Sequence, residues 1–227
     1  LGDCRFVDAN QQWGFDGLNR WSTAFSATWE ANQLLPTLVV GNYVDKDNPK
    51  GPFRACDANH LYRPNQHSYA TIQRLTPGYC ALSMLISDWG RHGKADLRIS
   101  NDRHYYVQGG QEQLMRLDKT PRFYQAKDGW KKLSLWGMGI SSRDISGDGL
   151  PEVFVTSMGD QKLLKLANNG KQPTYQEVSY QYGTTAHVPY LGDDGRPSSG
   201  WHAEFGDIDN DGRADLLFIT ENELIWY

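Results

Sequence analysis

Four aspartates stand within nine residues near the C-terminal end, in the segment FGDIDNDGRADLLFIT (205–220). Asp207, Asp209 and Asp211 alternate along the chain, and Asp215 closes the group. Carboxylates at this spacing repel one another unless a cation lies among them. Oxygen ligands at alternating positions of a tight loop suit Ca²⁺, which takes about 6–8 oxygens. The segment therefore predicts a calcium-binding loop.

The residues that follow indicate what kind of loop this is. Gly212 allows the sharp turn that points the carbonyl oxygen of Arg213 toward the carboxylates. The helical EF-hand loop is excluded, because no acidic residue stands at its twelfth position. The run ADLLFIT is short, apolar and branched, which favours a strand. The alternative is an Asp-rich turn exposed to water, since Asp, Asn and Gly are common in turns.

A second segment, SRDISGDGLPEVFVTS (142–157), repeats the spacing of the first. An apolar strand-like run again follows directly, as after the first loop. The predicted Ca²⁺ ligands are the side chains of Asp144, Ser146, Asp148 and Glu152 and the carbonyl oxygen of Leu150.

Two further segments keep less of the pattern. SDWGRHGKADLRIS (87–100) retains Asp88 and Asp96, but Gly90 and His92 stand where the middle carboxylates are expected. The segment ATWEANQLLPTLVVGN, earlier in the chain, keeps only a polar turn before an apolar run. A complete metal site is therefore expected in neither.

The four segments recur at a regular interval. The residues after the closing positions, Leu38, Leu97, Val153 and Leu216, lie about 60 residues apart, which indicates a repeat architecture. Each unit reads as four short strands separated by Gly, Asn and Pro, with the apolar run after the loop as an inner strand, and no helical period is sustained. We therefore predict one all-β domain over residues 1–227, a β-propeller with approximate units 1–80, 81–135, 136–200 and 201–227, the last incomplete.

These segments resemble the FG-GAP or VCBS repeat, the blade unit of the integrin α-subunit propeller. The surrounding sequence resembles bacterial members of the cartilage acidic protein family, in segments that include ACDANHLYRPN, GYCALSMLISDW and WGMGISSRDISGDGLPEVFVTSMGDQKLLKL. The resemblance covers nearly the whole chain. It implies an exported, calcium-binding β-propeller whose repeats carry no established enzymatic activity. Family ligand positions transfer fully to the third and fourth units, to Asp88 and Asp96 alone in the second, and to none in the first.

The length predicts an incomplete ring. Propellers have about 4–8 blades, and at 60 residues per blade 227 residues supply fewer than four. The chain is expected to be a fragment of a longer protein, or to pair with a second chain that completes the ring. A third alternative is that residues 1–25 close a four-bladed ring. An unclosed propeller exposes sheet edges that proteins normally cover.

Composition excludes several partners. The formal net charge is −4 and no basic block is present, so no nucleic-acid partner is expected. No apolar run reaches 18 residues, so no membrane span is expected. The chain carries no signal peptide and begins with Leu1, as a mature exported product does, so we expect an extracellular or periplasmic location.

The three cysteines are Cys4, Cys56 and Cys80. Cys56 and Cys80 are predicted to pair, because they lie in one unit on successive strands, and such a bridge stabilises the fold by roughly 3 kcal/mol. The alternative is three reduced, buried thiols.

Other chemistry finds little support. The six histidines have no paired spacing, and neither a nucleophile elbow nor a phosphate-binding loop is present. The leading prediction is a non-enzymatic scaffold for binding or adhesion, or an accessory subunit, with a protein or glycan partner. The alternative is an exported hydrolase or lyase built on the propeller. The polar insertion 190–202 is the candidate partner-contacting loop, unless it is a plain surface excursion.

Overall fold

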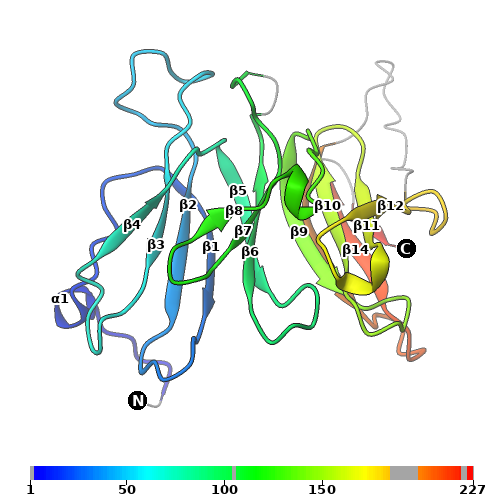
Figure 1. Cartoon of the computed structure of the whole chain (residues 1–227), viewed down its shortest axis with the longest axis horizontal. Coiled ribbons are helices and arrows are strands. Elements are labelled where there is room, and N and C mark those ends of the chain that lie inside the picture. The colour runs from blue at the N-terminus through cyan, green and yellow to red at the C-terminus, as the bar shows by residue number, and fades with distance from the viewer. Residues whose placement is uncertain (1–2, 104–105, 185–198, 221–223, 227) are drawn as a thin grey trace.

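The structure, a computed structural model, describes residues 3–103, 106–184, 199–220 and 224–226. The described residues form fifteen strands in four antiparallel sheets (Figure 1). Helical structure in this part of the chain is limited to α1 (Asn10–Trp13) and two 3-10 turns (Ala126–Asp128 and Asn168–Gly170). The all-β prediction is confirmed. No described helix is long and apolar enough to cross a membrane.

Each sheet is built from strands that follow one another along the chain. The first contains β1 (Ser22–Thr28), β2 (Thr37–Asn42), β3 (Asn59–Tyr62) and β4 (Ile72–Leu75). The second contains β5 (Ala81–Ser87), β6 (Asp96–Asn101), β7 (Gln113–Arg116) and β8 (Arg122–Phe123). The third contains β9 (Gly137–Arg143), β10 (Glu152–Ser157), β11 (Lys162–Leu166) and β12 (Tyr175–Glu177). The fourth contains β13 (Gly200–Gly206), β14 (Asp215–Thr220) and β15 (Leu224–Trp226).

The sheets lie side by side in chain order, as the blades of a propeller do (Figure 1). The first strands of successive sheets contact one another: β1 packs on β5, β5 on β9 and β9 on β13. The first and fourth sheets stand at opposite ends of this row (Figure 1). The described residues therefore form an incomplete β-propeller, as the chain length predicts.

The N-terminal segment before β1 packs on the outside of the first sheet. The ring of Phe15 lies 5.0 Å from that of Tyr62, whose hydroxyl donates a hydrogen bond to the carbonyl oxygen of Asp16. The amide of Tyr69 donates to the carbonyl oxygen of Trp13. The described part of residues 1–25 therefore adds no strand to the fourth sheet, which removes the four-bladed closure from the alternatives.

Apolar layers between neighbouring sheets form the core. Leu61, Leu97 and Ile99 fill the layer between the first and second sheets, and Phe154, Phe205 and Phe218 fill that between the third and fourth. The second strand of each sheet has a partner strand on both sides, and β6 and β10 are buried at every residue. The apolar runs after the Asp loops are therefore inner strands, because they are the residues that lose most water contact on folding.

In each of the first three sheets, a buried side chain at the start of the third strand, or directly before it, caps the C-terminal end of the second strand. In each case its oxygen accepts a hydrogen bond from the backbone N–H of the last strand residue. The pairs are Asn59 with Asn42 (3.0 Å), Glu112 with Asn101 (2.9 Å) and Gln161 with Ser157 (2.8 Å). A side-chain cap is needed there because an unpaired buried amide is costly.

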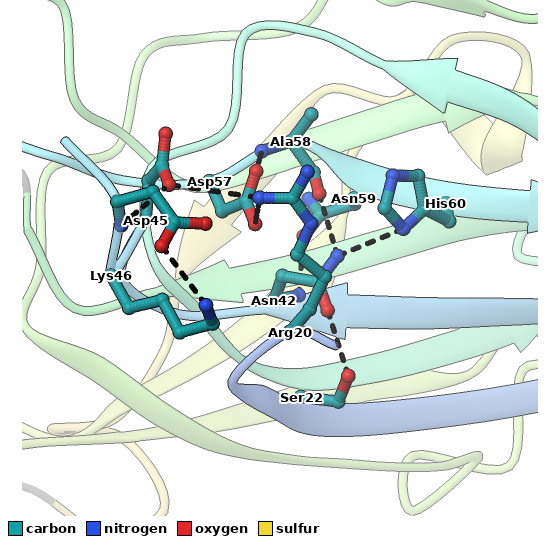
Figure 2. A network of polar contacts seen from close by, with 10 residues as sticks. Arg20, Ser22, Asn42, Asp45, Lys46, Asp57, Ala58, Asn59 and His60 are labelled. Atoms are coloured by element: carbon teal, nitrogen blue, oxygen red, sulfur yellow. Dashed lines mark hydrogen bonds and ion pairs between the residues drawn. The ribbon is translucent and has the colours of Figure 1, made fainter. Parts of the chain in front are cut away.

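Figure 2 shows this cap in the first sheet. Asn42 is fully buried, and its side chain accepts a hydrogen bond from Ser22 Oγ (2.8 Å) and donates to the carbonyl oxygen of Ala58 (2.7 Å). The same amide nitrogen lies 3.0 Å from His60 Nδ1. Burial lowers the pKa of His60, so the neutral ring suits this position. His60 is therefore explained as a structural residue.

The predicted disulfide joins Cys56 to Cys80, and Cys4 is a free, exposed thiol. Neither bridged residue lies in one of the named strands, which differs from the expectation of successive strands. Cys56 pairs with Val44 in an isolated bridge after β2, and Cys80 directly precedes β5. The disulfide consequently ties the first sheet to the start of the second.

We predict that a Cys56→Ser/Cys80→Ser double variant loses roughly 3 kcal/mol of unfolding free energy, because the unfolded chain regains the entropy of a loop closed over 24 residues. Urea denaturation measures this loss. Cys4→Ser is the matched control and leaves the midpoint unchanged. Equal midpoints for the double variant and the native chain would contradict the prediction.

The buried carboxyl group of Glu112 leads to a prediction about how stability depends on pH. Burial raises its pKa from 4.5 to about 7, so the fold favours the protonated acid. Its contribution to stability is complete below about pH 4.5 and is lost as the pH rises to about 7, by a total on the order of 3 kcal/mol. Gln stands at the matching cap of the third sheet, so we expect Glu112→Gln to fold and to lack this dependence. Denaturation of both chains between pH 4.5 and 8 checks it, and parallel stability curves would show that Glu112 is not the group responsible.

Candidate metal centre

The loops between the first and second strands of all four sheets lie at one end of the molecule, at the bottom of Figure 1. In each case the predicted closing position is the first residue of the second strand. These residues are Thr37 in β2, Asp96 in β6, Glu152 in β10 and Asp215 in β14. The closing side chain thus stands where a buried strand begins, so its contacts fix that point.

The second, third and fourth loops share one backbone conformation. The first aspartate of each accepts two hydrogen bonds from backbone amides further along the loop: Asp88 from His92 and Gly93, Asp144 from Gly147 and Gly149, and Asp207 from Asp211 and Gly212, at distances of 2.7–3.1 Å. The glycine is required because its φ is positive, 85° at both Gly149 and Gly212. The loop shape therefore does not depend on a full set of carboxylates.

The fourth loop brings three of its four predicted carboxylates together. One oxygen each of Asp207, Asp209 and Asp215 lies within 4.8 Å of the others. Asp215 also accepts a hydrogen bond from the amide of Ile208 (2.8 Å), which ties the start of β14 to the start of the loop. No lysine, arginine or histidine is paired with these three carboxylates in the part of the chain that the structure describes.

Asp211 lies outside this cluster. Its Oδ1 accepts a hydrogen bond from the backbone amide of Arg213 (2.8 Å), and its Oδ2 lies 3.8 Å from Arg213 Nε. The Arg213 side chain is 87% exposed, so water screens this pair strongly. The structure thus separates Asp211 from the three carboxylates that converge.

In the third loop a lysine ammonium lies among the predicted ligands. Lys165, from β11, places its Nζ 2.6 Å from Ser146 Oγ, 2.8 Å from Asp148 Oδ2 and 3.2 Å from Glu152 Oε1. The ion pair lowers the pKa of Asp148 and raises that of Lys165. The remaining predicted side-chain ligand, Asp144, bonds to backbone amides. The carbonyl donor residue, Leu150, packs its side chain against the cluster around Trp89.

In the second loop uncharged donors occupy the closing carboxylate. Asp96 is buried, and its Oδ2 accepts hydrogen bonds from Trp89 Nε1 (2.8 Å) and the Tyr124 hydroxyl (2.7 Å). Its Oδ1 accepts one from the amide of Leu117 (3.3 Å), and Asp88 bonds to backbone amides. Both carboxylate oxygens of Asp96, a predicted metal ligand, therefore already accept hydrogen bonds from the chain.

The first loop replaces the carboxylate at the closing position with a hydroxyl. Thr37 Oγ1 donates a hydrogen bond to Glu30 Oε1 (2.7 Å), which also accepts from Arg63 Nε (2.7 Å). The second, third and fourth loops thus keep one shape, and all four loops differ in what balances their polar groups.

The sequence contains a signal for the basic residues that lie beside the closing positions, but the signal can be read only once the strand register is known. Strand pairing places Arg116 opposite Asp96, and the pairs Leu38–Tyr62 and Val153–Leu164 set Arg63 and Lys165 one step further, beside Thr37 and Glu152. A basic residue therefore stands at the same third-strand position of three sheets. Loop spacing alone does not reveal it. The polar insertion 190–202, the candidate partner loop, lies outside the described residues except for its last four.

Comparison with known proteins matches part of this architecture. Residues 144–218 match the family described as FG-GAP-like repeat, a stretch that runs from the third loop into β14. No curated protein matches the chain. A solved structure described as a crystal structure of BBS1N in complex with ARL6DN, soaked with lead, is similar at a TM-score of 0.45 and 11% identity. That similarity covers 91% of this chain and 48% of the other, so this chain spans about half the length of that one.

We predict that Lys165→Met lowers the unfolding free energy by about 1–3 kcal/mol in calcium-free buffer, because it leaves the buried Glu152 without its charged partner. Lys162→Met is the matched control. Lys162 lies on the same strand and pairs with the exposed carboxylates of Asp160 and Glu177, so its loss costs less than about 1 kcal/mol. Chemical denaturation measures both, and equal losses would contradict the role given to Lys165.

Proposed function

We propose that the chain is an exported, calcium-binding β-propeller that acts as a non-enzymatic scaffold for binding or adhesion, alone or as an accessory subunit of a larger assembly. The observation that carries the proposal is the convergence of Asp207, Asp209 and Asp215 without a paired side-chain cation in the described chain. The match of residues 144–218 to FG-GAP-like repeats and the resemblance to the cartilage acidic protein family support it.

The geometry of the fourth loop suits Ca²⁺. Oxygens bound about 2.3–2.6 Å from one ion lie no more than about 5 Å apart, and the three carboxylate oxygens lie within 4.8 Å of one another. Asp211 and the carbonyl oxygen of Arg213 complete the proposed ligand set from the same loop. Bound Ca²⁺ neutralises the carboxylates and holds Asp215, and with it the start of β14.

The third loop is the weaker of the two proposed sites. Its ligands are Asp144, Ser146, Asp148, the carbonyl oxygen of Leu150 and Glu152. Ca²⁺ binding there requires the Lys165 ammonium to leave three of these groups. The affinity is reduced by the free energy of those contacts. In the second loop Asp88 and Asp96 have other partners, so no ion is proposed.

Export is supported by the disulfide, because such bonds persist mainly in oxidising compartments. A partner surface is supported by a hollow of about 460 Å³ to which all four sheets contribute. Trp21, Phe53 and Trp201 line it and are about half exposed, and Arg103 stacks on Tyr43 and other rings at 5.2–5.5 Å. Exposed aromatic patches of this kind mark binding surfaces, and both a protein and a glycan fit.

The test is calcium-dependent stability. With dissociation constants of about 10⁻⁴ to 10⁻³ M, 1 mM Ca²⁺ raises the unfolding free energy by about 0.4–1.4 kcal/mol per site. We predict that Asp209→Asn/Asp215→Asn removes most of this response, because it neutralises two of the three converging ligands. Calorimetric titration and thermal melting in EDTA and in Ca²⁺ measure it.

Asp47→Asn is the control, an exposed carboxylate in a turn of the first sheet, and it leaves the response intact. Far-ultraviolet circular dichroism in EDTA shows an unchanged β signal at room temperature, since the ion adds to an existing fold. Native-like calcium binding by the Asp209→Asn/Asp215→Asn variant would refute the site. A catalytic turnover abolished by EDTA without a shift in melting would refute the scaffold.

A further inference from the structure

Arg98, in β6, is a buried cation without a hydrogen-bond partner. It is 2% exposed between the second and third sheets. Its Nε, Nη1 and Nη2 atoms are buried, and none makes a hydrogen bond. The guanidinium carries five N–H donors and stays charged at all accessible pH values. A site with this many open donors is built to receive acceptor oxygens, because unpaired buried charges are strongly unfavourable.

Aromatic rings hold the guanidinium in place. Its central carbon lies 4.7 Å from the centroid of the Tyr175 ring and 5.3 Å from that of Trp130. Cation–π contacts engage the face of a guanidinium, whereas its hydrogen bonds leave from the edge. The rings therefore orient the group and leave its N–H donors open.

The buried acids nearest Arg98 in the described chain have other partners. Asp96 accepts hydrogen bonds from Trp89, Tyr124 and the amide of Leu117. Glu112 Oε1 accepts from the amide of Asn101, and burial favours its protonated form. In the described chain neither carboxylate forms an ion pair with Arg98, although the Arg98 charge partly offsets the rise that burial causes in the pKa of Glu112. Glu112 Oε2 has no partner, so a bridging water between it and Arg98 is the rival explanation.

Arg98 lines a cavity of about 190 Å³ between the two sheets. Trp130, Leu164 and Tyr175 supply apolar walls, and Lys131 and Lys132 add two further positive charges. Glu177 also lines the cavity, but it pairs with Lys162 at 3.0 Å. An apolar cavity of about 150 Å³ admits benzene, so a small aromatic or branched molecule fits here.

We propose that this cavity binds a small organic carboxylate, with its carboxylate bidentate on Arg98 and its apolar body between Trp130, Leu164 and Tyr175. A planar carboxylate matches the fork of the guanidinium. The mainly apolar walls favour an organic acid over an inorganic anion. The site lies on the described second and third sheets and uses none of the proposed calcium ligands, so it goes beyond the scaffold function and can fail independently of it.

The test titrates the full chain with benzoate, followed by calorimetry and by the fluorescence of the tryptophans. We expect saturable binding at one site, with no saturable binding of the neutral isostere benzamide. Arg98→Met weakens benzoate binding about 10- to 100-fold, the loss expected for charge-assisted hydrogen bonds. Lys131→Gln and Lys132→Gln weaken it by a smaller factor, and Lys94→Gln, an exposed lysine in the second loop, leaves it unchanged.

A second variant covers the case in which Arg98→Met does not fold. Leu164→Phe fills the cavity and abolishes benzoate binding, while circular dichroism and a cooperative thermal melt confirm an intact fold. Equal binding of benzamide would overturn the proposal, because the pocket would then be merely apolar. Saturation by inorganic phosphate with none by benzoate would overturn the choice of an organic carboxylate. No binding of any probe would overturn the proposal and leave a bridging water between Glu112 and Arg98 as the rival explanation.

Discussion

Each unit of this protein is built around an inner strand that is buried on both faces and has a partner strand on both sides. The polar groups at the ends of this strand must find hydrogen-bond partners within the chain. Water reaches neither face of β6 or β10, so every polar group at their ends requires a partner from the chain. At one end the polar loop supplies it, through aspartates that bind loop amides and a closing residue that begins the strand. At the other end two amides, Asn59 and Gln161, and one carboxyl group, Glu112, accept the same hydrogen bond.

The loops concentrate negative charge where the chain turns inward, and each unit balances it differently. The fourth loop leaves three carboxylates facing one another, the third inserts the Lys165 ammonium, and the second satisfies Asp96 with an indole and a phenol. In the second, third and fourth loops the first aspartate binds backbone amides three to five residues further along, so the fold tolerates these exchanges. The proposed calcium site consequently depends on side chains carried by a shared loop, not on the loop shape itself.

Local spacing was enough to predict the strands and the loops, because each depends on residues close in sequence. The Cys56–Cys80 pairing was also predicted correctly, although neither cysteine lies in a named strand as expected. Local spacing does not reveal the contacts that depend on strand register. Lys165 meets Glu152 only because Val153 pairs with Leu164, and Trp89 turns back onto a carboxylate seven residues later. Sequence patterns do not single out the site at Arg98 for a different reason. Its aromatic neighbours Trp130 and Tyr175 come from later in the chain, and a sequence does not show how neighbouring sheets face one another.

The different loop chemistries also give the row of sheets a direction. The first sheet is fastened to the second by a covalent bond, and the second and third begin their inner strands on contacts supplied by the chain itself. Among the described sheets, only the fourth begins on a group of like charges without a paired side-chain cation. Without a bound cation, loosening of the described sheets would therefore start at the fourth and spread toward the disulfide. The proposed calcium ion, once bound, would hold this sheet, so the ambient calcium concentration would set how readily a protease cleaves there.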